Sequence, residues 1–238
     1  MSLLVDASER TDKTEIMDDF SIDGPVLHDT LDKLSLINKW LGGTQVTIEG
    51  LKKLLKGQAK NEVLTIIDIG CGDGDILRKI ADFGKQEGYS FQLVGIDANE
   101  NTLDYARDLS KAYSSISYLN CDIFSEQFRM MKYDIVLSTL FLHHFKEIQL
   151  IDLLSLMHKR ATLGIVVNDL HRHPLAYYLF HLVCLLITNK MVKEDGLTSI
   201  LRGFKKNELE LITRRIGAKS QIKWKWAFRY QWIIQKRT

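Results

Sequence analysis

Three glycines that follow an apolar run are the residues with the clearest chemical meaning in this chain. Residues 64–74 read Leu-Thr-Ile-Ile-Asp-Ile-Gly-Cys-Gly-Asp-Gly. The apolar run has the length and composition of a buried parallel strand. Gly70, Gly72 and Gly74 allow a sharp turn and leave no Cβ between the backbone and a ligand. Apolar residues at helical spacing begin at Ile76, so a strand, a glycine loop and a helix form a nucleotide site on an α/β sheet.

The acids of this loop indicate the charge of the ligand. The loop departs from the dinucleotide fingerprint G-x-G-x-x-G, because its third glycine comes one residue early and Asp75 takes the sixth position. Asp73 and Asp75 would repel a pyrophosphate at the start of the helix. With Asp68 at the strand end, these carboxylates suit a ligand that carries a sulfonium or ammonium group. The pattern therefore disfavours a nicotinamide dehydrogenase.

The loop and three later segments resemble one known family. Asp68-Ile-Gly-Cys-Gly-Asp-Gly74 resembles motif I of the class I S-adenosylmethionine (SAM)-dependent methyltransferases. Val94-Gly-Ile-Asp97 and Ser117-Tyr-Leu-Asn-Cys-Asp122 end the next two strands in acids, as in that family. Tyr133-Asp-Ile-Val-Leu-Ser-Thr-Leu-Phe-Leu-His-His144 resembles the strand whose end faces the transferred methyl group.

The resemblance implies SAM as the cofactor and S-adenosylhomocysteine (SAH) as its product. It implies that Asp97 accepts hydrogen bonds from the ribose hydroxyls and that Asp122 binds the adenine amino group. The cofactor-binding residues expected on this basis are Asp68, Gly70, Cys71, Gly72, Asp97, Ala98, Asp122, Ile123, Ser138 and Thr139. Methyl transfer is a displacement at an activated carbon, so the protein mainly aligns the two reactants and excludes water.

Histidines at the ends of predicted strands are the candidates for a general base. Such a base is needed where the acceptor is a hydroxyl or an acidic carbon, and imidazole has a suitable pKa. His144 is the first candidate and His171 and His173 follow, while Asp169 could orient one of the rings. The alternative is that these histidines cap helices or bind backbone carbonyls.

No metal ion is expected at these histidines. His143 and His144, like His171 and His173, lack the spacing of a zinc site. Adjacent histidines at a strand end should also point to opposite faces of the sheet.

Strands and helices alternate regularly from residue 62. We expect strands near 64–70, 91–97, 116–121, 133–139 and 162–169, and helices near 75–87, 101–113, 125–131, 147–160 and 206–216. This alternation predicts an α/β fold with a Rossmann-like, doubly wound sheet. Period-two patterns at 222–228 and 230–234 add two strands. By resemblance the sheet has seven strands and is mostly parallel with an antiparallel C-terminal strand.

Two segments outside the alternation are expected to cover the site. Residues 1–60 form a helical N-terminal cap or lid, with amphipathic segments at 11–20, 29–41 and 48–55. One side of the second segment carries Leu31, Leu34, Ile37, Trp40 and Leu41. Residues 61–238 form the SAM-dependent methyltransferase domain, with an apolar lid insertion at about 172–203.

The apolar stretch 174–187 indicates what kind of acceptor the protein would bind. Its 14 residues are too few to span a membrane, which takes about 20. A lid helix of this kind would suit a small apolar, phenolic or quinol-like acceptor, and a dimer interface or core helix is the alternative. Arg172 and Arg202 could bind a carboxylate of the acceptor, or could simply be solvated.

Two short segments resemble particular methyltransferase types. Leu-His-His after the fourth strand resembles the ubiquinone/menaquinone-biosynthesis type, and Asn168-Asp-Leu-His-Arg-His-Pro174 resembles polyketide-associated small-molecule methyltransferases. Ser138-Thr-Leu-Phe differs from the Asn-Pro-Pro-Tyr of enzymes that methylate adenine or glutamine.

The length and composition of the chain are typical of one large globular domain. The chain has 238 residues, of which 45% are hydrophobic and 26% charged, and a net charge of +2 gives no bulk argument for nucleic acid. Three cysteines without metal-ligand spacing indicate a reducing compartment. Residues 1–10 lack the apolar core of a secretory signal, so we expect a cytoplasmic protein without a membrane span.

Two functional alternatives stay open at this point. Lysine and tryptophan alternate from Lys223, which could serve an RNA methyltransferase by stacking and phosphate binding. The same alternation is typical of a half-buried strand, and nucleic acid is not the expected partner. A non-catalytic SAM-binding protein is the second alternative. The expected partner is a small-molecule substrate, and a homodimer is possible.

Overall fold

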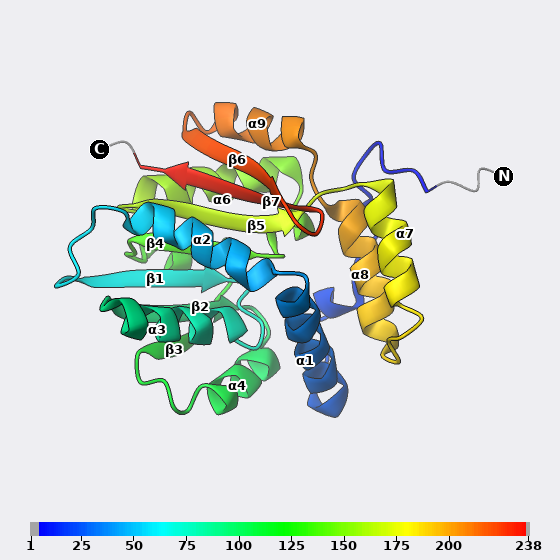
Figure 1. Cartoon of the computed structure of the whole chain (residues 1–238), viewed down its shortest axis with the longest axis horizontal. Helices are drawn as coiled ribbons and strands as arrows, with labels where there is room; N and C mark the ends of the chain where they lie inside the picture. The colour runs from blue at the N-terminus through cyan, green and yellow to red at the C-terminus, as the bar shows by residue number, and fades with distance from the viewer. Residues whose placement is uncertain (1–4, 237–238) are drawn as a thin grey trace.

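The computed structural model describes residues 5–236, so residues 1–4 of the predicted cap and 237–238 of the predicted domain lie outside it. Its centre is a seven-stranded sheet with the order β3-β2-β1-β4-β5-β7-β6 (Figure 1). The strands are β1 (Val63–Ile69), β2 (Ser90–Asp97), β3 (Ile116–Asn120), β4 (Ile135–Thr139), β5 (Gly164–Leu170), β6 (Lys219–Lys225) and β7 (Arg229–Gln235). Strands β1 to β5 pair in parallel, and β7 runs antiparallel to both β5 and β6. The predicted Rossmann-like fold with an antiparallel C-terminal strand is confirmed.

Alternating side chains of the central strands enter two separate cores. Ile66 and Val166 face one core, and their neighbours Ile67 and Val167 face the other. This alternation follows from the period of two along a strand. Strands buried on both faces are apolar throughout, which is why the sequence pattern located them well.

Helices cover both faces of the sheet. The helices are α1 (Gly24–Trp40), α2 (Gly43–Leu55), α3 (Asp75–Glu87), α4 (Glu100–Leu109), α5 (Glu126–Met130), α6 (Glu147–Arg160), α7 (Pro174–Val183), α8 (Lys190–Arg202) and α9 (Lys206–Arg215). Side chains of α2, α3 and α4 fill one core, and those of α5, α6 and α9 fill the other. Helices α1, α7 and α8 stand at the end of the sheet where β1 and β5 terminate (Figure 1). Substrates of open α/β sheets bind at that end.

The N-terminal segment differs from the expected helix at 11–20. Only a short 3₁₀ turn, η1 (Ile16–Asp18), forms there. The carboxylate of Asp195 on α8 accepts hydrogen bonds from the backbone N–H groups of Ile16 and Met17, at 2.7 and 3.0 Å. Because these donors are bound to another helix, the segment runs as a strap across α8 instead of coiling on itself.

Three smaller expectations are corrected by the structure. Helix α4 ends at Leu109, before the predicted residue 113, and the predicted strand at 222–228 ends at Lys225. The strand stops early because residues 226–228 make the turn to β7, where Phe228 adopts φ +51°. Trp40 does not share the face of Leu31, and 77% of its surface is exposed. Among the described residues, no helix has the length and apolar character that crossing a bilayer requires.

Candidate active site

One large cavity lies where the parallel strands end. Its volume is about 1540 Å³. The cavity is lined by the ends of β1 to β5, by α1 and α7, and by the N-terminal strap, defined as residues 10–18. Of the predicted cofactor residues, those on its wall are Asp68, Gly70, Cys71, Gly72, Asp97, Ala98, Asp122, Ile123 and Thr139. The remaining one, Ser138, is fully buried in β4 and does not line the cavity.

The glycine loop is shaped by a close contact behind it. Gly70 adopts φ +65°, a left-handed conformation that favours glycine. Its N–H donates to the carbonyl of Ile96 at 2.8 Å, which ties β1 to β2. A Cβ at Gly70 would lie 2.2 Å from Cδ2 of Phe141, so a larger residue would displace that ring. The loop therefore presents bare backbone to the cavity.

Three acids surround this loop without enough positive charge to balance them. Asp68 is 2% exposed, and its Oδ1 has no hydrogen-bond partner among the described residues. Burial, together with the charges of Asp97 and Asp73, raises the pKa of Asp68 to about 7. Burial also raises the pKa of Asp97 and of Asp73. Arg78 is an ion-pair partner of Asp73 at 3.2 Å, so one cation serves three acids. A cationic ligand would relieve this repulsion.

Asp97 is oriented by the backbone around it. Its Oδ2 accepts from the N–H of Gly72 at 3.3 Å, and its Oδ1 from the N–H of Asn99 at 3.0 Å. Asp122 is held in the same way by the N–H of Phe124 at 2.9 Å. Fixed carboxylates of this kind suit the recognition of ligand hydroxyl and amino groups.

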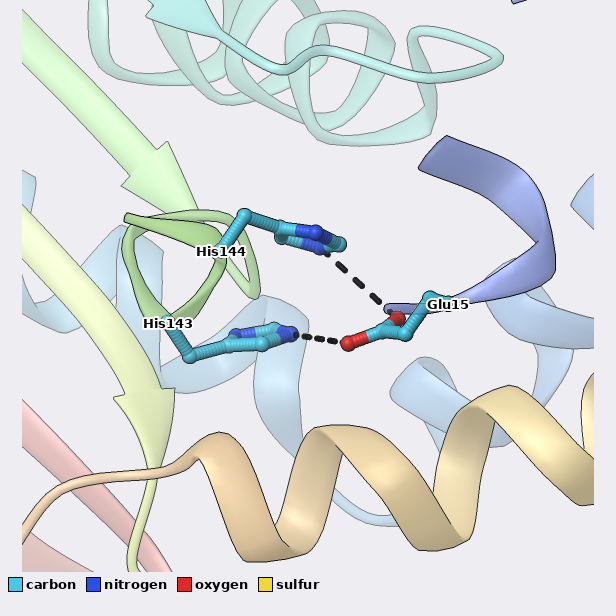
Figure 2. A group of neighbouring side chains, drawn as sticks. All are labelled: Glu15, His143 and His144. Carbon is cyan, nitrogen blue, oxygen red and sulfur yellow. Dashed lines mark ion pairs between the residues drawn. The ribbon is translucent and has the colours of Figure 1, made fainter. Parts of the chain in front are cut away.

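Opposite the acids, two histidines meet the N-terminal strap (Figure 2). Nδ1 of His143 lies 2.7 Å from Oδ1 of Asp169, and its Nε2 lies 3.4 Å from Oε1 of Glu15. Nδ1 of His144 lies 2.7 Å from Oδ1 of Asp18, and its Nε2 lies 3.8 Å from Oε2 of Glu15. Each ring thus has one carboxylate at Nδ1 and faces Glu15 with Nε2.

The expectation that these two rings point to opposite faces is wrong. Strand β4 ends at Thr139, and the histidines belong to a 3₁₀ turn, η2 (Leu142–His144). Successive residues of a turn diverge less than those of a strand, and the two ring centroids lie 4.4 Å apart.

His143 is buried among carboxylates and is held in its charged form. Its side chain is 2% exposed. Burial alone would lower the pKa of His143, but the charge and hydrogen bond of Asp169, together with the nearby carboxylate of Glu15, raise it to about 9. The pKa of Glu15 and of Asp169 is lowered by the same ring, against the effect of burial. His143 is therefore an imidazolium that links β5 to the strap.

The three predicted catalytic histidines have different surroundings. His144 and His171 line the cavity, whereas His173 does not. Nδ1 of His173 accepts from the N–H of Leu175 at 3.1 Å and caps α7. Nδ1 of His171 lies 3.2 Å from Nε1 of Trp224, and burial with the charges of His173 and Arg172 lowers the pKa of His171 to about 4. Of these three histidines, His144 alone lines the cavity and also has its Nε2 near a carboxylate, that of Glu15.

Glu15, His143 and His144 are also a group whose residue types could hold a metal ion. One ligand atom from each lies within 4.8 Å of the others. Their charges are already matched by ion pairs, since Arg202 lies 2.8 Å from Asp18 and 3.6 Å from Glu15. The absence of a metal stays a prediction.

The strap residues were missed by the sequence analysis. Arg10 donates to the carbonyls of Phe145 and Arg202 at 2.9 and 2.7 Å, and Ser199 donates to Glu15 at 2.8 Å. Glu15 and Asp18 lie more than 100 positions before the histidines that they contact. The concentration of acids in residues 1–42 was the only sequence signal for these contacts.

Residues 66–164 match a family model described as a methyltransferase domain. This segment is thereby identified as a methyltransferase domain. The matched range contains the glycine loop, Asp97, Asp122 and the histidine turn. The resemblance to class I SAM-dependent methyltransferases is confirmed.

A curated relative matches part of the methyltransferase domain. The chain is 34% identical over 80 residues to the protein-lysine N-methyltransferase EFM4 of Saccharomyces cerevisiae. The match covers 32% of this chain and only 33% of that protein.

Solved structures share the fold at low sequence identity. The plantazolicin methyltransferase BpumL in complex with SAH has a TM-score of 0.64 at 18% identity, covering 89% of each chain. Human N-acetylserotonin methyltransferase in complex with SAM has a TM-score of 0.62 at 14% identity, covering 89% of this chain and 57% of that chain. The CMeT domain of the citrinin polyketide synthase has a TM-score of 0.58 at 18% identity, covering 78% and 50%.

The glycine loop leads to a prediction for the methyltransferase domain. Gly70→Ala should weaken SAM binding at least about tenfold, because the new Cβ must displace Phe141 at the cavity wall. Calorimetric titration with SAM measures the effect. Gly57→Ala is the matched control, since Gly57 has φ +85° but no atom within 4 Å of its added Cβ. Equal SAM affinity of the two variants would contradict the prediction.

The charged His143 leads to a prediction about pH. A folded-state pKa near 9, above the ordinary value of 6.5, gives stability that is complete below pH 6.5 and is lost as the pH rises through 9. The midpoint of urea unfolding should fall from pH 7 to 9 in the wild type, and much less in His143→Gln.

His181→Gln, on the exposed side of α7, is the control and should keep the wild-type slope. The groups that face His143 are Asp169, Glu15 and His144, and the two carboxylates stay ionised over this pH range. An unchanged slope in His143→Gln would mean that another group titrates.

Proposed function

We propose that this chain transfers the methyl group of SAM to a small, largely apolar acceptor, such as a phenol or quinol. The observation that carries the proposal is a single cavity with three different walls. One wall is acidic, one carries histidines, and the third is the apolar face of α7. Its volume of about 1540 Å³ exceeds the roughly 300–1,000 Å³ of ordinary small-molecule sites, so it has room for a cofactor and a second molecule.

The acidic wall fits SAM. Asp68 keeps a buried carboxylate oxygen without a partner, and the glycine loop presents backbone in place of side chains. By resemblance, Asp97 would bind the ribose hydroxyls and Asp122 the adenine amino group. When bound, SAM supplies a methyl group on a positively charged sulfur. The acids of this wall favour that charge over the negative charge of a dinucleotide.

His144 is the residue that we assign as general base. Asp18 accepts the hydrogen bond from Nδ1–H, which leaves the lone pair of Nε2 free to take up a proton from the acceptor. The imidazolium that forms is stabilised by Asp18 and by Glu15, whose Oε2 lies 3.8 Å from Nε2. His143 already carries a proton, so it keeps Asp169 and Glu15 in place and does not act as the base.

Helix α7 supplies the apolar wall. Leu179, Leu182 and Val183 line the cavity and are still 43%, 59% and 42% exposed. Because a closed core would hide these side chains, we assign them to contact with an apolar acceptor. Their burial by the acceptor would also exclude water from the reaction. The predicted lid insertion, homodimer and cytoplasmic location stay predictions.

The activity itself is the first test. With labelled SAM and a panel of phenols, quinols and hydroxy acids, we expect transfer by the wild type and a loss of about 100-fold or more in kcat for His144→Gln. Asp18→Asn should lose less, because it weakens the orientation of the ring without removing it. His173→Gln, whose ring caps α7 outside the cavity, should retain the wild-type rate.

Two outcomes would contradict this assignment. Equal rates for His144→Gln and His173→Gln would exclude His144 as the base. Loss of transfer on treatment with a chelator, with recovery on addition of Zn²⁺ or Mg²⁺, would show that the reaction requires a metal ion, for which Glu15, His143 and His144 are the candidate ligands.

Cofactor binding should depend on pH through Asp68. Its pKa of about 7 means that the carboxyl is largely protonated at pH 6 and ionised at pH 8. The affinity for cationic SAM should therefore rise by up to about tenfold between these values, and Asp68→Asn should abolish the rise. Titration calorimetry at both pH values measures it, and a flat profile in the wild type would refute the role of Asp68.

A further inference from the structure

Arg229 is a buried cation that the described part of the chain leaves without an ion pair. It is the first residue of β7, is 2% exposed and lines the cavity. Its Nε and Nη1 atoms have no hydrogen-bond partner among the described residues. Burial lowers the pKa of Arg229 to about 10, which still leaves the group charged at neutral pH. A guanidinium in this state requires an anion.

The other buried arginines near the cavity are already occupied. Arg172 is bound to Glu208 at 2.6 Å and donates to the carbonyls of Ala7 and Ser8. Arg202 is bound to Asp18 at 2.8 Å and donates to the carbonyl of His144 at 2.6 Å. Both were candidates to bind an acceptor carboxylate, and neither has its guanidinium free to do so. Arg229 does.

Among the residues that the structure describes, no carboxylate forms an ion pair with Arg229. Asp169 exerts an attraction on Arg229, but its Oδ1 is bound to His143 Nδ1 and to the N–H of Leu170, both at 2.7 Å. Its Oδ2 accepts from the N–H of His143 at 3.2 Å. Asp169 thus already faces the His143 imidazolium, and among the described residues no hydrogen bond or ion pair joins it to Arg229.

The missing Cβ of Gly43 allows the side chains of Asn38 and Arg229 to approach the same point. A Cβ on Gly43 would lie 2.9 Å from Nη1 of Arg229 and 1.9 Å from Oδ1 of Asn38. Oδ1 of Asn38 is a second buried polar atom without a partner, and Asn38 also lines the cavity. The amide of Asn38 is neutral, so it cannot balance the guanidinium charge. Unpaired polar atoms in two residues that line a cavity call for an explanation, and a polar ligand group is one that the cavity can supply.

The position in the sheet indicates which ligand reaches Arg229. The cofactor loops follow β1, β2 and β3, whereas β4 and β5 separate β1 from β7. With strands about 4.8 Å apart, Arg229 stands roughly 14 Å across the sheet from the cofactor loop of β1. It therefore lies on the side of the histidines and α7, where the acceptor is expected.

We propose that Arg229 binds a carboxylate of the acceptor, so that the substrate is an apolar acid that carries a separate methylatable group. This inference rests on the proposed function, because it names the substrate class of the same cavity. A guanidinium binds a carboxylate through two parallel hydrogen bonds. A single negative charge matches the single positive charge, whereas a phosphate dianion would leave a buried excess.

The test compares matched acids and amides. Hydroxybenzoates and hydroxycinnamates, and the corresponding amides, are titrated into the full chain saturated with SAH, so that binding is measured without methyl transfer. We expect at least one acid to bind about tenfold or more tightly than its amide, and this preference to vanish in Arg229→Met. Arg229→Lys, which keeps the charge without the fork, should retain part of the preference.

Arg172→Met is the matched control, since Arg172 is equally buried but already paired. It should lower the Tm, whereas Arg229→Met should leave it unchanged or raise it, because an unpaired buried charge is removed. A drop in Tm for Arg229→Met equal to that for Arg172→Met would overturn the proposal and assign Arg229 to the fold.

Two further outcomes would also overturn it. If no acid in the panel binds more tightly than its amide, the cavity does not recognise a carboxylate. If Arg229→Met weakens SAM binding as much as acid binding, the carboxylate at Arg229 belongs to the cofactor. Neither result depends on methyl transfer, so failure of this inference is distinguishable from failure of the proposed activity.

Discussion

The ion pairs of His143 hold the two sides of the cavity together. Asp169 belongs to β5 and Glu15 to the N-terminal strap, and one imidazolium bridges them. A charge this deeply buried is stable only when its partners surround it, so removing either carboxylate would leave a costly unpaired ion. The strap also contacts α8 and the histidine turn through polar groups, among them Arg10 and Asp195. Its position therefore follows from electrostatics more than from apolar packing.

The charges on the cavity wall differ between its two sides. Asp68, Asp73 and Asp97 form an excess of negative charge on one side, and Arg229 is an unbalanced positive charge on the other. Both arrangements are unfavourable in the free protein. Each side would be stabilised by a ligand group of opposite charge. The free protein is therefore less stable than it would be with balanced charges, but its cavity favours ligands of a particular charge. The orientation of two molecules in one cavity would follow from this asymmetry.

The sheet and the cofactor loops could be predicted from the sequence because the patterns that indicate them lie within short, contiguous segments. β4 and β5 are apolar on both faces, and the glycine loop is contiguous in sequence with its strand and helix. The acceptor side could not be predicted in the same way. Glu15 contacts His143 across more than 100 residues, and Arg229 differs from other arginines only in the partners that it lacks among the described residues. Trp40 was misplaced because an amphipathic pattern does not say whether a face meets the core, a cavity or solvent.

The lysines near the C-terminus lie on β6, which is an edge strand of the sheet. An edge strand exposes unpaired backbone groups to which another chain can add as a further strand. Lys219 and Lys223 stand exposed on β6, and Lys225 is bound to Glu49 at 2.7 Å. Charged side chains at such a border oppose the addition of a second sheet. Lysines on an edge strand are a common feature of sheet proteins that resist such pairing, so their alternation does not require a nucleic-acid partner.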